Sequence, residues 1–265
     1  MFTIADGERA AEVVTAADPG RADDAVAWAR AKLGFAADAA QARVLRSAAR
    51  RVILNCTRQW GKSTVTAAKA VHAAVTQAES LTVVVSPSAR QSGEFVRKAE
   101  GFVRRLGMRV RGDGDNEISL AFENGSRIVG LPGTEDTVRG FSAVNLLLVD
   151  EAARVNDELY VAVRPMVAVS GGTLWLMSTP RGRRGFFYET WQGQEGAAEW
   201  ERVQVTAEEC PRIPREFLEE ERRTMGEQAY QQEYGCAFSD AVTAVFDRDL
   251  VERAITDEFA PLRID

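Results

Sequence analysis

The amino-acid sequence predicts an α/β fold with a mainly parallel sheet flanked by helices. Two observations carry this prediction. Short apolar runs with the composition of buried strands alternate with helical stretches, the pattern of a parallel sheet joined by right-handed crossovers. A loop that ends in glycine, lysine and serine connects the first of these strands to its helix. The four apolar runs span residues 51–56, 81–86, 145–149 and 172–179.

The other elements are predicted from residue periodicity and from turn residues. An antiparallel excursion is expected where alternating residues flank a hairpin turn at 123–125, and an edge strand is expected over 200–205. A polar helical stretch over 214–236, interrupted at Gly226, predicts a lid. The excursion consists of strands 108–112, 117–122 and 126–131, and the other helices span 22–34, 38–51, 62–78, 89–107 and 158–169, the last interrupted near Pro165.

Composition and charge exclude several classes of protein. The chain has 265 residues and a net charge of −6, and none of its apolar runs approaches the ~20 residues that span a bilayer. The N-terminus lacks the basic and apolar regions of a signal peptide, so an intracellular protein without a membrane partner is expected. Three widely spaced cysteines argue against a disulfide framework or a zinc site, and a single histidine, His72, excludes a Ser-His-Asp triad built elsewhere.

The stretch "CTRQWGKST" (56–64) matches a phosphate-binding loop in its second half. Gly61, Lys62 and Ser63 have the usual spacing, but Cys56 stands where the pattern G-x-x-x-x-G-K-[ST] has its first glycine. A phosphate is held by backbone N–H groups, by Lys62 and, through Mg²⁺, by the Ser63 hydroxyl, none of which requires a particular side chain at position 56. The first glycine mainly relieves crowding, so a small residue can replace it.

Two further groups of polar residues follow apolar strands. Asp150 and Glu151 end the run "NLLLV"; Asp150 could hold a metal and Glu151 could activate a water, although Asp150 could also cap the next helix. Ser178, Thr179 and Pro180 end the run "TLWLM", where they either finish the strand or sense the terminal phosphate. Together with the lysine loop, these residues predict an ATP-hydrolysing site that uses ATP and Mg²⁺.

The order "RQWGKST", "VRGFSAVNLLLVDEA" and "MSTPRGRRGFFYETW" resembles the ATPase domain of the large terminase subunit of tailed bacteriophages and prophages. Those motors carry a variant phosphate loop without the leading glycine, so the cysteine is compatible with function. The resemblance covers about residues 35–250. It implies a RecA-like (ASCE) P-loop NTPase, divided into an N-terminal helical extension (1–34), an ATPase core (35–206) and a helical lid subdomain with a linker (207–265).

The resemblance also implies roles for individual residues. Gln41 matches a glutamine suited to reading adenine, although it could equally be an exposed helical residue, and Arg139 or Arg58 would neutralise charge in the transition state. We favour Arg139 as a finger inserted into a neighbouring subunit and Arg58 as a γ-phosphate sensor. The ATP-binding set is completed by Gln59, Gly61, Lys62, Ser63 and Thr64, the metal ligands by Ser63 and Asp150, and the coupling motif by Ser178, Thr179 and Pro180.

The resemblance implies an ATP-driven motor that moves double-stranded DNA into a procapsid in the cytoplasm of an infected or lysogenic bacterium. Its partners would be the portal protein, the small terminase subunit and further copies in a homo-oligomeric ring, a pentamer by resemblance. Candidate DNA contacts lie in two basic stretches, which otherwise read as solvated surface. The nuclease domain of full-length terminases is not expected in this chain. The candidate contacts are Arg104, Arg105, Arg181, Arg183 and Arg184.

Three other functions remain as alternatives. A helicase-like, nucleic-acid-dependent ATPase would show a second RecA-like domain with its own arginine finger. A small-molecule kinase would need no Glu151 beside Asp150, because its reaction activates no water. A nucleotide-binding structural module without turnover would be insensitive to replacement of Glu151.

Overall fold

The computed structural model describes residues 24–116, 118–133, 140–193 and 199–239. Within them, seven strands form one sheet in the order β3-β4-β2-β5-β6-β1-β7. All neighbouring strands are parallel except β3 and β4. The strands are β1 (Arg51–Cys56), β2 (Leu81–Ser86), β3 (Ser119–Ala121), β4 (Arg127–Pro132), β5 (Leu146–Asp150), β6 (Thr173–Ser178) and β7 (Glu201–Val205).

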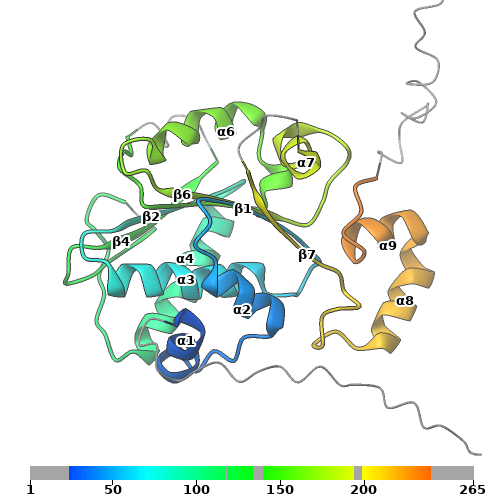
Figure 1. The fold of residues 1–265 in the computed structure, drawn as a ribbon, viewed down its shortest axis with the longest axis horizontal. Coiled ribbons are helices and arrows are strands. Elements are labelled where there is room, and N and C mark those ends of the chain that lie inside the picture. Colours follow the sequence, from blue (N-terminus) through cyan, green and yellow to red (C-terminus); the bar gives the residue numbers. More distant parts are fainter. Residues whose placement is uncertain (1–23, 117, 134–139, 194–198, 240–265) are drawn as a thin grey trace, which may run out of the picture.

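Helices cover both faces of this sheet (Figure 1). The first four helices lie on one face, α6 and α7 lie on the other, and α8 and α9 stand beside the β7 edge. The α-helices are α1 (Ala25–Leu33), α2 (Ala39–Arg46), α3 (Lys62–Thr76), α4 (Ala89–Arg105), α6 (Asp157–Val163), α7 (Gly185–Gln192), α8 (Arg215–Met225) and α9 (Glu227–Glu233), and short 3-10 turns are η1 (Ala152–Arg154) and η2 (Arg164–Val167).

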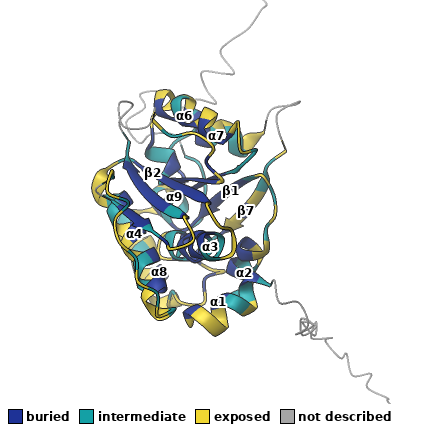
Figure 2. Ribbon diagram, turned by 90° about the vertical axis from the view of Figure 1, so that its left-hand side faces the viewer, coloured by how far each residue is buried: buried dark blue, intermediate teal, exposed yellow. Residues whose placement is uncertain are grey.

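The core is divided by the sheet because successive side chains of a strand point to opposite faces. In β1, Val52 and Leu54 pack with the α1–α4 layer, whereas Ile53 packs with the α6 and α7 layer. Strands buried on both faces must be apolar throughout, which explains the continuous runs in the sequence. The central strands are accordingly buried, whereas the edge strand β7 is partly exposed, and other exposed residues gather on the outer sides of the helices (Figure 2).

The predicted elements agree with the structure except in two regions. The helix predicted over 38–51 is shorter, because α2 ends at Arg46 before β1 begins at Arg51, and the other difference lies between 108 and 131. The residues of 51–56 and 81–86 form the strands expected, α8 and α9 separate at Gly226, and β7 pairs with β1 at the sheet edge. The strand predicted over 108–112 is wrong: this stretch makes one isolated bridge, Arg111 to Ala121. The predicted antiparallel excursion is part of the main sheet. Strands β3 and β4 are antiparallel to each other, but β4 pairs in parallel with β2.

No helix in the described parts of the chain is both long enough and apolar enough to cross a membrane.

Candidate nucleotide site

The phosphate-binding loop (57–61) connects β1 to α3. Cys56 is the last residue of β1 and pairs with Val205, so its backbone is extended and needs no glycine. Left-handed backbone falls instead at Gln59, with φ 62°, and at Gly61, with φ 96°. A Cβ on Gly61 would also approach the Gln41 amide nitrogen to 3.1 Å. The structure thus explains why cysteine is tolerated at position 56 and why glycine is retained at position 61.

The N-terminus of α3 is built for an anion. Gly61 precedes the helix and no side chain caps it, so the first backbone N–H groups have no side-chain acceptor. The buried ammonium of Lys62 donates to the carbonyl oxygens of Cys56 and Thr57, at 3.1 and 3.2 Å. Lys62 therefore lies folded back along the loop, beside the same helix end.

Ser63 and Asp150 bring the loop and the acidic strand together. The Ser63 hydroxyl donates to Oδ2 of Asp150 at 3.1 Å, across 87 residues of sequence. Asp150 is 6% exposed, and burial, together with the neighbouring Glu151, raises the pKa of its carboxyl above the ordinary value. A hydroxyl beside a buried carboxylate is a ligand pair that suits Mg²⁺, which prefers oxygen ligands and keeps several waters or phosphate oxygens.

Glu151 follows directly in a left-handed conformation, with φ 52° and ψ 41°. This conformation is unfavourable for a glutamate and turns the chain sharply out of β5 into η1. The carboxylate of Glu151 accepts a hydrogen bond of 2.9 Å from Arg154, and the same Arg154 nitrogen lies 3.2 Å from the Thr179 hydroxyl. Arg154 therefore connects Glu151, the acid predicted to activate water, to Thr179 of the predicted coupling motif.

The coupling motif lies beside the phosphate loop, because β6 pairs with β1. Ser178 and Asn55 are partners in this pairing, and both are completely buried. The Ser178 hydroxyl and Asn55 Oδ1 have no hydrogen-bond partner among the described residues, although buried polar atoms are normally paired. These two oxygens mark a polar position next to the loop. Of the two residues, only Ser178 was predicted as a site residue.

Gln41 is buried, not exposed. Its amide donates to the Trp60 carbonyl at 3.0 Å and accepts from the Asp38 backbone N–H at 3.2 Å, which completes a capping box at the start of α2. Arg212 donates to the same Trp60 carbonyl and forms an ion pair of 2.9 Å with Asp38. Both polar atoms of the Gln41 amide thus contact the protein, and adenine recognition by Gln41 stays a prediction.

The end of α9 lies against the start of the loop. The Glu233 carbonyl accepts from the Arg58 backbone N–H at 3.4 Å and from the Thr57 hydroxyl at 3.2 Å. Its carboxylate lies 3.6 Å from Arg58 and 3.8 Å from Arg154. The sequence analysis missed Glu233, Arg154 and Arg212, because each is one charged residue in a charged stretch and is brought to the site only by the fold.

The remaining predicted residues are Arg139 and the candidate DNA contacts. Arg139 is outside the described residues. Arg104 and Arg105 end α4, at the edge of the sheet away from the loop; Arg104 pairs with Glu100 at 2.6 Å and Arg105 donates to the Leu33 carbonyl at 2.8 Å. The segment with Arg181, Arg183 and Arg184 follows β6 at the same edge as the phosphate loop, and Arg183 donates to the Phe238 carbonyl.

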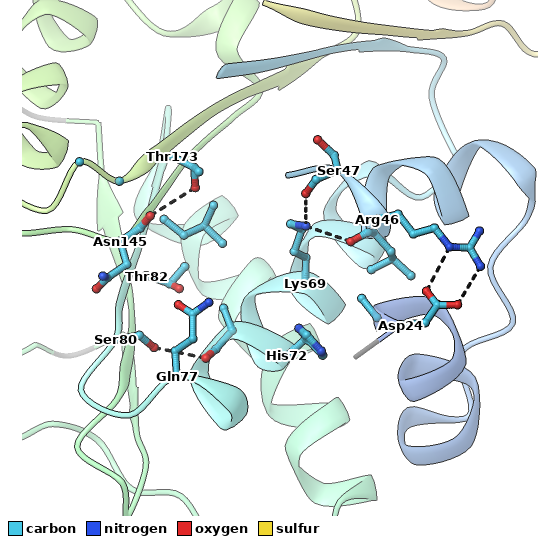
Figure 3. A pocket seen from close by; sticks show the side chains of 16 residues that line it. Asp24, Arg46, Ser47, Lys69, His72, Gln77, Ser80, Thr82, Asn145 and Thr173 are labelled. Carbon is cyan, nitrogen blue, oxygen red and sulfur yellow. Dashed lines mark hydrogen bonds and ion pairs between the residues drawn. The ribbon is translucent and has the colours of Figure 1, made fainter. Parts of the chain in front are cut away.

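A cavity of about 1150 Å³ opens at the opposite end of the sheet (Figure 3). Asp24 and Arg46 form an ion pair on one side, and Asn145 and Thr173 lie on the other. Between them, Lys69 donates to the carbonyls of Leu45 and Ser47 at 2.9 and 2.7 Å. Because this cavity lies at the opposite end of α3 from the loop, it is not part of the nucleotide site.

Comparison with known proteins identifies the family. The family model described as "Terminase large subunit, T4likevirus-type, N-terminal" matches residues 53–253. The chain belongs to the terminase large-subunit family. It is 28% identical over 173 residues to the "Terminase, large subunit" of Escherichia phage T5, a match that covers 62% of this chain and 39% of that protein. The chain therefore spans about two fifths of the length of this curated relative.

Solved terminase structures share the fold. The large terminase ATPase domain of Thermus phage P74-26 superposes with a TM-score of 0.69 at 22% identity, covering 79% of this chain and 97% of that one. The large terminase of the thermophilic bacteriophage D6E gives 0.65 at 17% identity, covering 80% and 56%. The predicted RecA-like fold is confirmed, with β6 between the loop strand β1 and the acid strand β5.

Proposed function

We propose that this chain is the ATP-hydrolysing motor domain of a terminase large subunit, which moves double-stranded DNA into a procapsid. The observation that carries the proposal is the hydrogen bond of 3.1 Å between Ser63 and Asp150, because it places the phosphate loop and the acidic strand at one point. Glu151 follows Asp150 and suits a general base for the attacking water. A relative from phage D6E has been solved with ATP-γ-S, which supports nucleotide as the ligand.

Each group in the site has a role in hydrolysis. The N–H groups at the start of α3 and Lys62 bind the phosphates, since a phosphate oxygen is a stronger acceptor than the loop carbonyls that Lys62 now contacts. Ser63 and Asp150 would hold Mg²⁺, which when bound would neutralise charge on the phosphates. Glu151 takes a proton from water. Arg58 contacts the terminal phosphate. Ser178 and Thr179 couple the presence of this phosphate to the conformation of the rest of the domain.

Family membership supports a proposal for the wider assembly. The partners we propose are DNA, the portal protein, the small terminase subunit and other copies in a pentameric ring in the bacterial cytoplasm, with Arg139 as the finger between copies. For DNA, we favour the segment with Arg181, Arg183 and Arg184, because it leaves the sheet at the same edge as the phosphate loop. We also propose that the motor core ends near residue 206 and that the lid follows. The terminase match favours packaging over a helicase-like translocase.

Replacement of Glu151 tests the proposed activity. Glu151→Gln keeps the size of the side chain and removes the base, so phosphate release should fall by about 10²-fold or more. Glu158→Gln is the matched control, because Glu158 is an exposed residue in the first turn of α6. Unchanged phosphate release in Glu151→Gln would contradict the assignment.

A further inference from the structure

We propose that Arg154 is a positioning residue that fixes the carboxylate of Glu151 and connects it, through Glu233, to the lid helix α9. This inference rests on the proposed ATPase function and goes beyond it, because it adds a residue outside the predicted motifs. In this proposal, the contact between Arg154 and Glu233 is the one through which the position of the lid affects Glu151, the general base.

The first half of the connection is the contact with Glu151. Arg154 lies one turn along the chain from Glu151, in η1, and one of its nitrogens donates both to the Glu151 carboxylate and to the Thr179 hydroxyl. A guanidinium group is planar and rigid, so fixing it against Thr179 at the end of β6 also fixes the direction of the carboxylate. The orientation of Glu151 therefore depends on Arg154.

The second half is the contact with α9. The other terminal nitrogen of Arg154 lies 3.8 Å from the Glu233 carboxylate, whose second oxygen lies 3.6 Å from Arg58. The charges thus alternate in the order Glu151, Arg154, Glu233, Arg58. The side chains of Arg154 and Glu233 are 27% and 19% exposed, so they are screened less than a surface pair would be.

Glu233 also connects the lid to the phosphate loop through its backbone. Its carbonyl accepts from Thr57 and Arg58, the first two residues of the loop. A movement of α9 therefore changes the distances from Glu233 to Arg154 and to Arg58 together. It thereby changes how strongly Glu233 competes with Glu151 for the guanidinium group of Arg154. Packed side chains and salt bridges that join two elements are one physical route by which the position of one element affects the other.

Steady-state kinetics of four variants test the connection. Arg154→Gln should lower kcat about 10-fold with KM for ATP within about twofold, because it misplaces the base and leaves the phosphate contacts intact. Arg154→Lys should recover part of the loss. Glu233→Gln should lower kcat about threefold alone and no further in the Arg154→Gln background. Independent effects that multiply in the double variant, or an unchanged kcat in Arg154→Gln, would overturn the proposal.

A control and a second readout separate this proposal from the function on which it rests. Glu227→Gln changes the same helix but alters only exposed contacts, the ion pair with Arg222 and the hydrogen bond from Gln231, so kcat should not change. Amide hydrogen exchange over 227–239 should be about threefold or more faster in Arg154→Gln than in the native chain and in Glu227→Gln. If the native chain has no ATP turnover, the proposed function fails, and hydrogen exchange alone tests the connection between Arg154 and α9. Equal exchange rates in Arg154→Gln and in the native chain would overturn that connection.

Discussion

Ser63 in the first turn of α3 and Asp150 at the end of β5 are joined by a hydrogen bond of 3.1 Å, although 87 residues separate them in the sequence. The parallel sheet makes this contact possible, because the carboxyl ends of β1 and β5 meet at one edge with β6 between them. This edge of the sheet, and the core that supports it, therefore determine whether the site can form.

Removal of the Ser63 hydroxyl should weaken the response to magnesium. Ser63→Ala removes one of two proposed oxygen ligands, so the Mg²⁺ concentration for half-maximal ATP turnover should rise about 10-fold or more. A magnesium titration of turnover measures this. Thr76→Ala, at the other end of α3, is the control and should titrate like the native chain. An unchanged midpoint in Ser63→Ala would remove Ser63 from the metal site.

Alanine at Gly61 should destabilise the folded chain. The backbone at Gly61 has φ 96°, and a Cβ would meet the Gln41 amide at 3.1 Å, so Gly61→Ala should lower the free energy of unfolding by about 1–3 kcal/mol. Urea unfolding measures this. Gly101→Ala is the matched control: Gly101 lies inside α4 with nothing within 4 Å of a Cβ, and the change should stabilise by about 0.5–1 kcal/mol.

Because of Lys69, the free energy of unfolding should depend on pH in the alkaline range. Burial lowers the pKa of its ammonium from 10.5 to about 8. Between these two values the unfolded chain binds more protons than the folded one, so the free energy of unfolding should rise with pH, by on the order of 1–2 kcal/mol from pH 8 to 10. Denaturant unfolding of native chain and Lys69→Met compares the two slopes. Equal slopes would show that Lys69 is not responsible.

The cysteines should resist thiol reagents. Cys56, Cys210 and Cys236 are free and almost completely buried, and burial raises the pKa of Cys236 to about 12 and that of Cys56 further above its ordinary range. Because the thiolate is the reactive form, native protein should react with a chromogenic disulfide about 10-fold or more slowly than protein in urea. Rapid reaction of any cysteine in the native chain would contradict the packing around it.

The sequence predicted those strands and site residues that can be recognised from a local pattern of residues. Continuous apolar runs identified β1 and β2, and the residues that follow buried strands identified Ser63, Asp150 and Ser178 as neighbours. It failed where tertiary contacts decide. The stretch 108–112 alternates like a strand, yet it makes one bridge to Ala121 because β3 is only three residues long.

The charged residues around Glu151 show the same limit. Arg154 and Glu233 are 79 positions apart, and neither stands in a motif. They meet because the chain returns from β7 through α8 and α9 to the start of the phosphate loop. Periodicity describes one element at a time, so it contains no information about such a return.

The central claim is that α3, Ser63 and Asp150 bind a single magnesium–nucleotide complex. A crystal structure of the chain with ATP-γ-S and Mg²⁺ tests it most directly. We expect the phosphates at the N-terminus of α3 within hydrogen-bond distance of Lys62, and the metal in contact with Ser63 and held by Asp150. A nucleotide bound elsewhere, or a metal remote from both residues, would contradict the account.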